Sequence, residues 1–337
     1  MISKMMQLIL AVSLISIIGC QASPHVDLTF QRGVQLLAAG SPKTAIPLLT
    51  QVVSSIPDGP EPHAMLAMAY ALDLQSERAI AQARQAQREK NEPPGWELIA
   101  VGIAELSQGR YDKAASRFDE VDMSFPPEHP MSVAARQWLV LSMLLKGDFK
   151  VSMDLLDGLE ITSGRSTAML WTVLVLARQG MAQEASEMLA IIAATSSLPG
   201  PTSTTTNNPP DSRTLYEQAL IAVSVREFDK AQESFTALIE RNSNSCDAPT
   251  WLALIAAAEG DWSLTMTRLR DGCETGSNKS RGVAHQLYGV ACAMERMPDN
   301  VVRSMVVGQR LLGRGTSPAH AVSQPKPDAV WLSDSMK

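Results

Sequence analysis

Small and apolar residues recur along most of this chain with a period of about 34 residues, and their spacing within each period is that of helices. The first unit, from Val26, places Gly33, Ala45 and Leu49 at its eighth, twentieth and twenty-fourth positions. The eight units start at Val26, Pro60, Gly95, Val133, Ser166, Ser212, Cys246 and Gly282, in steps of 34, 35, 38, 33, 46, 34 and 36 residues. No comparable stretch alternates with a period of two, so the pattern predicts helix pairs and almost no strand.

Three positions of the unit carry the pattern. The eighth position is small or compact, which lets the two helices of a pair approach closely: Gly33, Ala67, Gly102, Val140, Val173, Ala219, Ala253 and Gly289. The twentieth position reads Ala45, Ala79, Ala114, Ser152, Ala185, Ala231, Thr265 and Val301. We expect the twenty-fourth position to pack between helix pairs; it reads Leu49, Ala83, Phe118, Leu156, Leu189, Phe235, Leu269 and Met305. Units four and seven follow the pattern more weakly, and unit eight only marginally.

Glycine marks the turn between the two helices of several units. In the first unit, Gly40 ends one helix, and Ser41-Pro42 suits the N-cap and first position of the next. Gly109, Gly147 and Gly260 occupy the same turn in later units. Glycine is common there because it readily adopts the left-handed conformation that ends a helix.

This combination of period, small residues and turns resembles the tetratricopeptide repeat, a helix–turn–helix unit that stacks into a solenoid. The resemblance implies an all-α fold, a right-handed superhelical solenoid of about eight units. Units one to five would cover residues 26–195 and units six to eight residues 213–312, with the marginal eighth unit as a capping repeat. An irregular helical bundle with chance alanine spacing is the alternative.

Residues 1–19 have the properties of a signal peptide rather than of a folded segment. Lys4 gives a positive start, and the apolar stretch from Leu8 to Ile18 is too short to span a bilayer core of roughly 30 Å. The junction Gly19-Cys20 that follows is the feature that distinguishes this signal from an ordinary one.

That junction resembles the bacterial lipobox, which implies that Cys20 is lipidated and becomes the first residue of the mature chain. Residues 20–25 would then be a lipidated tether. The resemblance also implies the outer rather than the inner membrane, because Gln21 and not Asp follows the cysteine. An ordinary secretory signal with a chance cysteine remains the alternative.

Two segments lack an apolar period. Residues 196–212 are dense in Pro, Thr and Asn and predict a flexible linker, which accounts for the 46-residue step between units five and six. Residues 313–337 predict a disordered tail, in which Ala329–Leu332 is a short apolar cluster that could dock on the array.

The charge balance is mildly acidic, with 29 Lys and Arg against 35 Asp and Glu, a net charge of −6. No cluster or stripe of basic residues occurs, which argues against a nucleic-acid partner. An acidic surface of this size indicates solubility more often than a binding device.

Three cysteines remain besides Cys20. Cys246 opens the first helix of unit seven and Cys273 ends its second helix, so an antiparallel pair would bring them within disulfide reach in an oxidising compartment. Two reduced cysteines are the alternative. Cys292 falls at a core position and reads as a small buried apolar residue.

No catalytic constellation stands out. The histidines at positions 25, 63, 129, 285 and 320 show no metal-ligand spacing, and phosphate loops, nucleophile elbows and dinucleotide fingerprints do not occur. We therefore expect no enzyme activity, no cofactor and no metal site.

The tetratricopeptide resemblance implies a concave face lined by the fifth and ninth positions of each unit. The ninth position is apolar throughout: Val34, Met68, Ile103, Leu141, Leu174, Leu220, Leu254 and Val290. The central residues Ile99, Ile103, Leu141, Leu170 and Leu174 would form the hot spot of a partner-binding groove. The family's basic carboxylate clamp is missing. Burial of this face by tight winding of the array is an equal alternative.

The resemblance therefore implies a non-catalytic protein-interaction scaffold. With the lipobox, it implies a membrane-anchored protein that faces the periplasm and helps to assemble a complex of the bacterial cell envelope, by analogy of fold alone. The partner would be one or more envelope proteins. The alternative function is a binding protein for an apolar ligand or lipid in the same groove.

Overall fold

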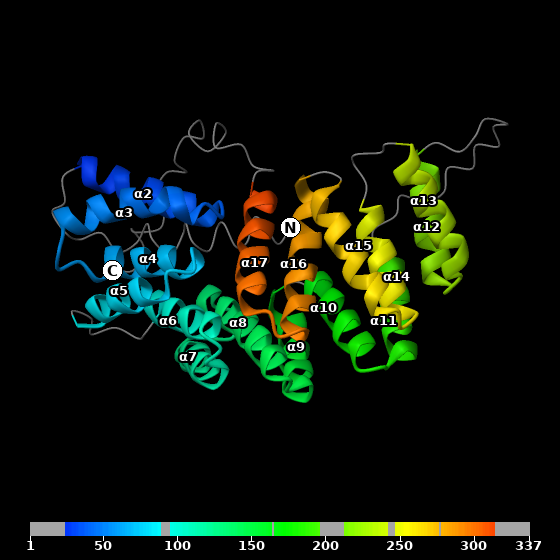
Figure 1. The fold of residues 1–337 in the computed structure, drawn as a ribbon, viewed down its shortest axis with the longest axis horizontal. Helices are drawn as coiled ribbons and strands as arrows, with labels where there is room; N and C mark the ends of the chain where they lie inside the picture. Colours follow the sequence, from blue (N-terminus) through cyan, green and yellow to red (C-terminus); the bar gives the residue numbers. More distant parts are fainter. Residues whose placement is uncertain are drawn as a thin grey trace, which may run out of the picture.

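The computed structural model describes residues 24–88, 95–163, 165–195, 212–241, 247–275 and 278–313, which form sixteen α-helices and no strand (Figure 1). The first helices of the eight pairs are α2 (Pro24–Ala38), α4 (Pro60–Leu72), α6 (Trp96–Ser107), α8 (Pro130–Lys146), α10 (Arg165–Arg178), α12 (Ser212–Ser224), α14 (Ala248–Ala258) and α16 (Asn278–Met294). The second helices are α3 (Pro42–Ser55), α5 (Ser76–Arg88), α7 (Tyr111–Ser124), α9 (Phe149–Ser163), α11 (Ala182–Thr195), α13 (Phe228–Glu240), α15 (Trp262–Glu274) and α17 (Pro298–Gly313). The all-α prediction is confirmed.

One backbone feature sets the register of all eight pairs. The residue at the fifteenth position of each unit has a positive φ and lies in the turn between the two helices: Gly40, Leu74, Gly109, Gly147, Gly180, Arg226, Gly260 and Arg296. Their spacing reproduces the predicted steps of 34, 35, 38, 33, 46, 34 and 36 residues. The left-handed conformation occurs even where the residue is Leu or Arg, so the turn geometry is imposed by the packing of the two helices.

The small eighth position packs against the twenty-fourth position of its own unit. A Cβ placed on Gly102 would lie 2.5 Å from the Phe118 ring, and one on Gly33 would lie 2.8 Å from Leu49 Cδ2. The twenty-fourth position therefore fills the space left by the small residue inside a pair. In two units it also contacts the next pair, as expected: the Phe118 ring stacks on Trp138 of α8, and the Phe235 ring stacks on Trp251 of α14. The twentieth position is fully buried in every unit.

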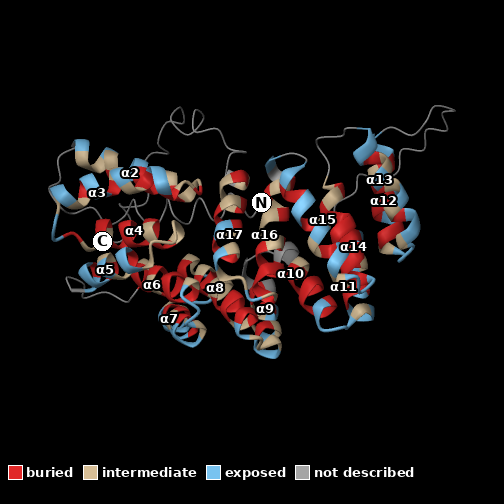
Figure 2. Ribbon diagram, in the orientation of Figure 1, coloured by how far each residue is buried: buried red, intermediate tan, exposed pale blue. Residues whose placement is uncertain are grey.

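The later units depart from a simple stack. Helices α10 and α11 of the fifth unit pack against α14 of the seventh, while α12 packs on α11 and α13 packs on α14. The sixth pair thus lies at one end of the elongated molecule (Figure 1). Helix α14 is surrounded by neighbours, and ten of its eleven residues are buried (Figure 2). A helix that is apolar on all sides requires such a position.

The eighth pair does not cap the end of the array. Helices α16 and α17 lie in the middle of the molecule, with the first three pairs on one side and the sixth and seventh pairs on the other (Figure 1). Our expectation of a terminal capping repeat is therefore wrong. In the part of the chain that the structure describes, no helix combines the length and the apolar character needed to cross a bilayer.

The positive φ at Arg296, +57°, gives a test of the turn geometry. A side chain in the left-handed conformation costs about 1 kcal/mol relative to glycine. Arg296→Gly should therefore raise the free energy of unfolding by about 1 kcal/mol over Arg296→Ala, which also removes the side chain but keeps the strain. Urea unfolding of both variants measures the difference. Equal stability of the two variants would contradict the assignment.

Candidate functional site

The five residues predicted to line a partner groove do not line an open surface. Ile99, Ile103, Leu141 and Leu174 are buried, and Leu170 is half-buried. All eight residues at the ninth position are buried, with exposed fractions between 0% and 6%. The face is therefore buried, although not by the tight winding of the array that the sequence left open as the alternative.

The eighth helix pair covers this surface. We call the surface formed by α4, α6, α8 and α10 the first-helix face. Helix α16 packs against both α8 and α10, and α17 packs against α6, α4 and α2. Residues of α16 and α17, among them Leu287, Val290 and Val302, belong to the same hydrophobic cluster as Ile103 and Leu174. The candidate groove is thus filled by the chain's own last helix pair.

Two glycines let α16 and α17 pack closely enough to fit there. A Cβ on Gly308 would lie 2.9 Å from the carbonyl oxygen of Gly282, and one on Gly282 would lie 2.7 Å from Leu312 Cγ. Since carbonyl oxygens of a helix cannot move aside, the crossing of the two helices requires glycine at position 308. The pair enters the molecule as one compact unit.

One edge of the inserted pair contacts the first unit. A Cβ on Gly40, which has a φ of +62°, would lie 2.5 Å from the Val306 carbonyl oxygen and 2.7 Å from the Arg310 nitrogen. The Gln309 side-chain amide donates to the Ala38 carbonyl oxygen at 3.3 Å. The turn of the first unit and the last helix are therefore in backbone contact across some 270 residues of sequence.

The opposite end of the inserted pair is held by a polar cluster. Glu295, in the turn between α16 and α17, accepts from Arg178 Nε at 3.0 Å and from Trp262 Nε1 at 2.8 Å. The Arg178 guanidinium also lies 5.5 Å from the centre of the Trp262 ring. The cluster links the fifth, seventh and eighth units at one point.

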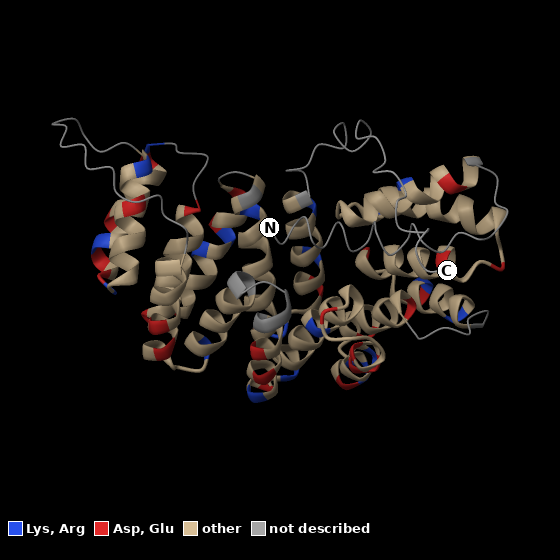
Figure 3. Cartoon of the chain, turned by 180° about the vertical axis from the view of Figure 1, so that it is seen from behind, with Lys and Arg blue, Asp and Glu red and all other residues tan. Residues whose placement is uncertain are grey.

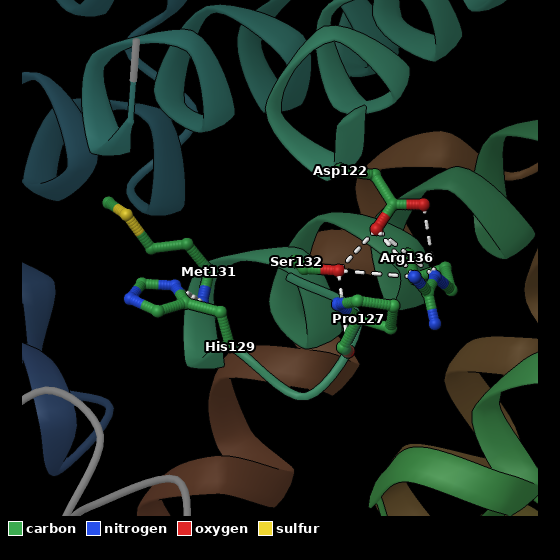
Figure 4. A network of polar contacts seen from close by, with 6 residues as sticks. All are labelled: Asp122, Pro127, His129, Met131, Ser132 and Arg136. Carbon is green, nitrogen blue, oxygen red and sulfur yellow. Dashed lines mark hydrogen bonds and ion pairs between the residues drawn. The ribbon is translucent and has the colours of Figure 1, made fainter. Parts of the chain in front are cut away.

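A second polar network fixes the connection between α7 and α8 (Figure 4). Arg136 donates to Asp122 at 2.8 Å, and Ser132 also donates to that carboxylate. The Asp122 and Arg136 side chains are only 16% and 13% exposed. His129 Nδ1 accepts from the Met131 amide at 3.3 Å and so caps α8. These groups are occupied in holding α8 under the inserted pair.

Burial shifts the pKa values of three side chains in the seventh and eighth units. Burial, together with the positive charges of Arg281 and Arg310, lowers the pKa of His285 to about 4. Burial raises the pKa of Cys273 to about 12 and that of Cys292 to about 11. Both side chains are buried, so each of them, as a thiol, is protonated and poorly nucleophilic at neutral pH. Within the described ranges, no three His, Cys, Asp or Glu side chains gather so as to hold a metal ion.

Several sequence-based predictions fall outside the described residues. They concern the signal peptide and Cys20, most of the segments 196–212 and 313–337, and Cys246. The bridge between Cys246 and Cys273 therefore stays a prediction. The anchoring role of Cys20 likewise rests on the sequence alone.

The sequence pattern did not predict that α16 and α17 cover the first-helix face, because the pattern describes each unit separately and not the contacts between distant units. One signal was available: no charged residue occurs between Arg281 and Glu295, a span of thirteen residues. A capping helix exposes one polar face to solvent, so an uncharged span of this length indicates a helix that is covered on all sides.

Comparison with known proteins places one part of the chain in a known family. A family model described as tetratricopeptide repeat matches residues 208–264, a range that includes α12, α13 and α14. No curated protein matches the chain at the same level of significance.

The solved structures that match this chain have low sequence identity and TM-scores below 0.5. One matching structure comes from a functional characterization of pilF from Pseudomonas aeruginosa. It is 18% identical to this chain, the match covers 64% of this chain and 90% of the matched chain, and the TM-score is 0.45. A tetratricopeptide repeat protein from Parabacteroides merdae is 13% identical, with coverages of 80% and 99% and a TM-score of 0.43. The Cut9–Hcn1 hetero-tetramer of APC/C is 13% identical, with coverages of 92% and 57% and a TM-score of 0.39. The functions of these proteins are not transferred to this chain.

The burial of the first-helix face predicts the result of a charge substitution there. Changing Ile103 and Leu174 together to Glu should lower the free energy of unfolding by several kcal/mol, because two carboxylates would be buried without partners. Circular dichroism melting measures the effect. Ile239→Glu on α13, where the native side chain is 38% exposed, is the control and should melt near the parent temperature. A double variant that keeps the parent melting temperature would mean that the face is open.

His285 predicts a loss of stability in mild acid. Its folded pKa of about 4 lies below the ordinary 6.5, so between these values the unfolded chain binds a proton that the folded chain does not. Stability contributed by this group is therefore complete above pH 6.5 and falls as the pH drops toward 4. Since the side chain is partly exposed, we expect on the order of 1 kcal/mol. His285→Gln should lose less stability than the parent between pH 7 and pH 5 in urea unfolding; equal losses would contradict the assignment.

Proposed function

We propose that this chain is a tetratricopeptide-repeat protein that works as a scaffold and binds other proteins. The observation that carries the proposal is the repeat itself, which is matched by the family model over residues 208–264 and continues in register through eight helix pairs. Tetratricopeptide repeats are generally non-catalytic and present extended, rigid helix surfaces to partners. We therefore assign the chain no enzyme activity.

The filled first-helix face restricts where a partner can bind. Because Ile103, Leu141 and Leu174 are buried, contacts must be made by residues that stay exposed in the folded chain. The second helices of the first seven pairs supply such a surface, since each buries one stripe and leaves the opposite side in solvent (Figure 2). The central groove residues serve to hold the eighth unit.

The cellular setting of the proposal comes from the amino-terminal sequence. The apolar stretch that ends at Gly19-Cys20 supports lipidation of Cys20, and Gln21 favours the outer over the inner membrane. With helix α2 starting at Pro24, the repeats would sit close to the membrane and face the periplasm. We propose that the scaffold acts there in the assembly of a cell-envelope complex.

A binding protein for an apolar ligand or lipid is the alternative function. It would use the apolar ninth-position residues, and these are packed against α16 and α17 rather than exposed. The structure therefore offers this function no open surface, and we prefer the scaffold.

Affinity capture through the intact, lipid-anchored chain tests the proposal. Capture from membranes of the producing cells should yield a stoichiometric envelope protein, and Cys20→Ser should lose fatty-acid labelling and shift the chain to the soluble fraction. Cys292→Ser, which removes a buried thiol, is the matched control and should keep both the label and the membrane fraction.

The two parts of the proposal can fail separately. Labelling that survives Cys20→Ser would contradict the anchor while leaving the scaffold untouched. Extractable lipid in place of a co-purified protein would contradict the scaffold and favour the alternative function.

A further inference from the structure

The tenth position of the first helix distinguishes the sixth unit from the others. It reads Gln35, Ala69, Ala104, Ser142, Val175, Ile221, Ile255 and Ala291. Six of these residues are buried, and only Gln35 and Ile221 are exposed. Gln35 is polar, as suits an outer surface, whereas Ile221 is a large apolar residue with 49% of its surface exposed.

The displaced sixth unit explains this exposure. In the fifth unit, α10 packs against α14 of the seventh unit. Among the helices that the structure describes, none is therefore stacked on the side of α12 that carries Ile221. The sixth pair lies at one end of the elongated molecule (Figure 1). Ends of repeat arrays normally carry a polar outer face, which prevents further stacking. The end formed by the sixth unit lacks this protection.

Ile221 belongs to an apolar patch on two helices, α11 and α12. Val225, one turn further along, is 60% exposed, and Ile191 of α11 is 49% exposed. The ion pair between Glu187 and Arg226, at 3.5 Å, joins the two helices on this side. Because α11 and α12 run in opposite directions (Figure 1), that pairing places Ile191 and Ile221 at about the same level along the two helices. We call Ile191, Ile221 and Val225 the end patch.

The charges around the end patch are arranged so that two copies of the chain, related by a two-fold axis, would bring opposite charges together. Arg213 and Glu217 lie toward the start of α12, whereas Arg226 and Glu227 follow its end, and both signs of charge occur along α12 and α13 (Figure 3). Within one copy Arg213 pairs with Glu217 at 2.9 Å, and Arg226 pairs with Glu187 at 3.5 Å. A second α12 laid antiparallel on the first would bring Glu217 toward Arg226 of the second copy, so that these ion pairs extend into one network across the contact. A two-fold axis produces this contact twice. A second copy of this chain therefore matches the patch in charge as well as in apolar character.

We propose that the end patch is the contact surface of a homodimer, with a two-fold axis close to Ile221. Helices α11 and α12 are each about 20 Å long, so the face spans on the order of 400 Å² per copy. This is about half of what a stable interface buries, and the dimer is accordingly weak, with a Kd in the micromolar range. The proposal stands on the α11–α12 face alone and does not depend on the lipid anchor.

A disulfide placed on the axis is the most direct test. In a two-fold dimer Ile221 faces Ile221 of the second copy, so Ile221→Cys in the intact chain should form a covalent dimer under mild oxidation. Glu233→Cys, on an exposed position of α13, and the parent chain are controls for random and native-cysteine cross-links. Covalent dimer no more abundant for Ile221→Cys than for Glu233→Cys would overturn the proposal.

Sedimentation of the intact chain in mild detergent gives a second test. The parent should dimerise with rising concentration, and Ile221→Glu should raise the Kd by more than about tenfold while leaving the circular dichroism spectrum unchanged. Ile239→Glu should leave the Kd unchanged. Glu217→Arg should also weaken the dimer, because the new arginine would lie toward Arg226 of the second copy. A parent chain that stays monomeric, or that uses Ile221 only to bind a different protein, would overturn the homodimer.

Discussion

The packing of α16 and α17 on the first-helix face is the interaction on which the rest of this structure depends. It buries an apolar surface that runs through the first helices of the first five pairs and would otherwise face water. Burial of apolar surface is the main favourable term in folding, and here one helix pair supplies it for several units at once. The contact of Gly40 with α17 and the cluster around Glu295 then fix both ends of the inserted pair. The chain is closed on itself, whereas a simple repeat array contacts only its neighbours.

The geometry of each helix pair is set by a second, local constraint. A small residue at the eighth position admits a large one at the twenty-fourth, as Gly102 admits Phe118. The turn then takes a left-handed residue at the fifteenth position, even where Leu74 or Arg226 bears the strain. These short-range requirements repeat without interruption through eight pairs. They explain why the sixth to eighth units keep the same positions for the small residues and the turn after the 46-residue step. The order in which the pairs stack, by contrast, changes after the fifth unit.

The closed form changes what the protein can offer to partners. Residues that a tetratricopeptide array would present in its groove are here part of the core, so binding must use the outer surfaces. The displaced sixth unit creates one such surface at the end of the molecule, where Ile221 and Val225 are exposed because none of the described helices is stacked on that side of α12. The covering of the first-helix face and the exposure of Ile221 at the end of the molecule have the same cause. The seventh and eighth pairs fold back on the first five and leave the sixth outside.

The sequence by itself determined the elements and their pairing. The sequence repeats alanine at positions such as 45, 79 and 114, and glycine at positions 40, 109 and 147. The close contact of the small residues and the left-handed turn are both requirements within one helix pair, so they appear as a repeating pattern in the sequence. What covers Ile103 and Leu174 was decided only by the tertiary structure. An apolar face at helical spacing looks the same whether it awaits a partner or meets α16, because the contact joins residues more than a hundred positions apart. Only the uncharged span from Gly282 to Met294 hinted at the answer, since a helix buried on every side cannot carry unpaired charge.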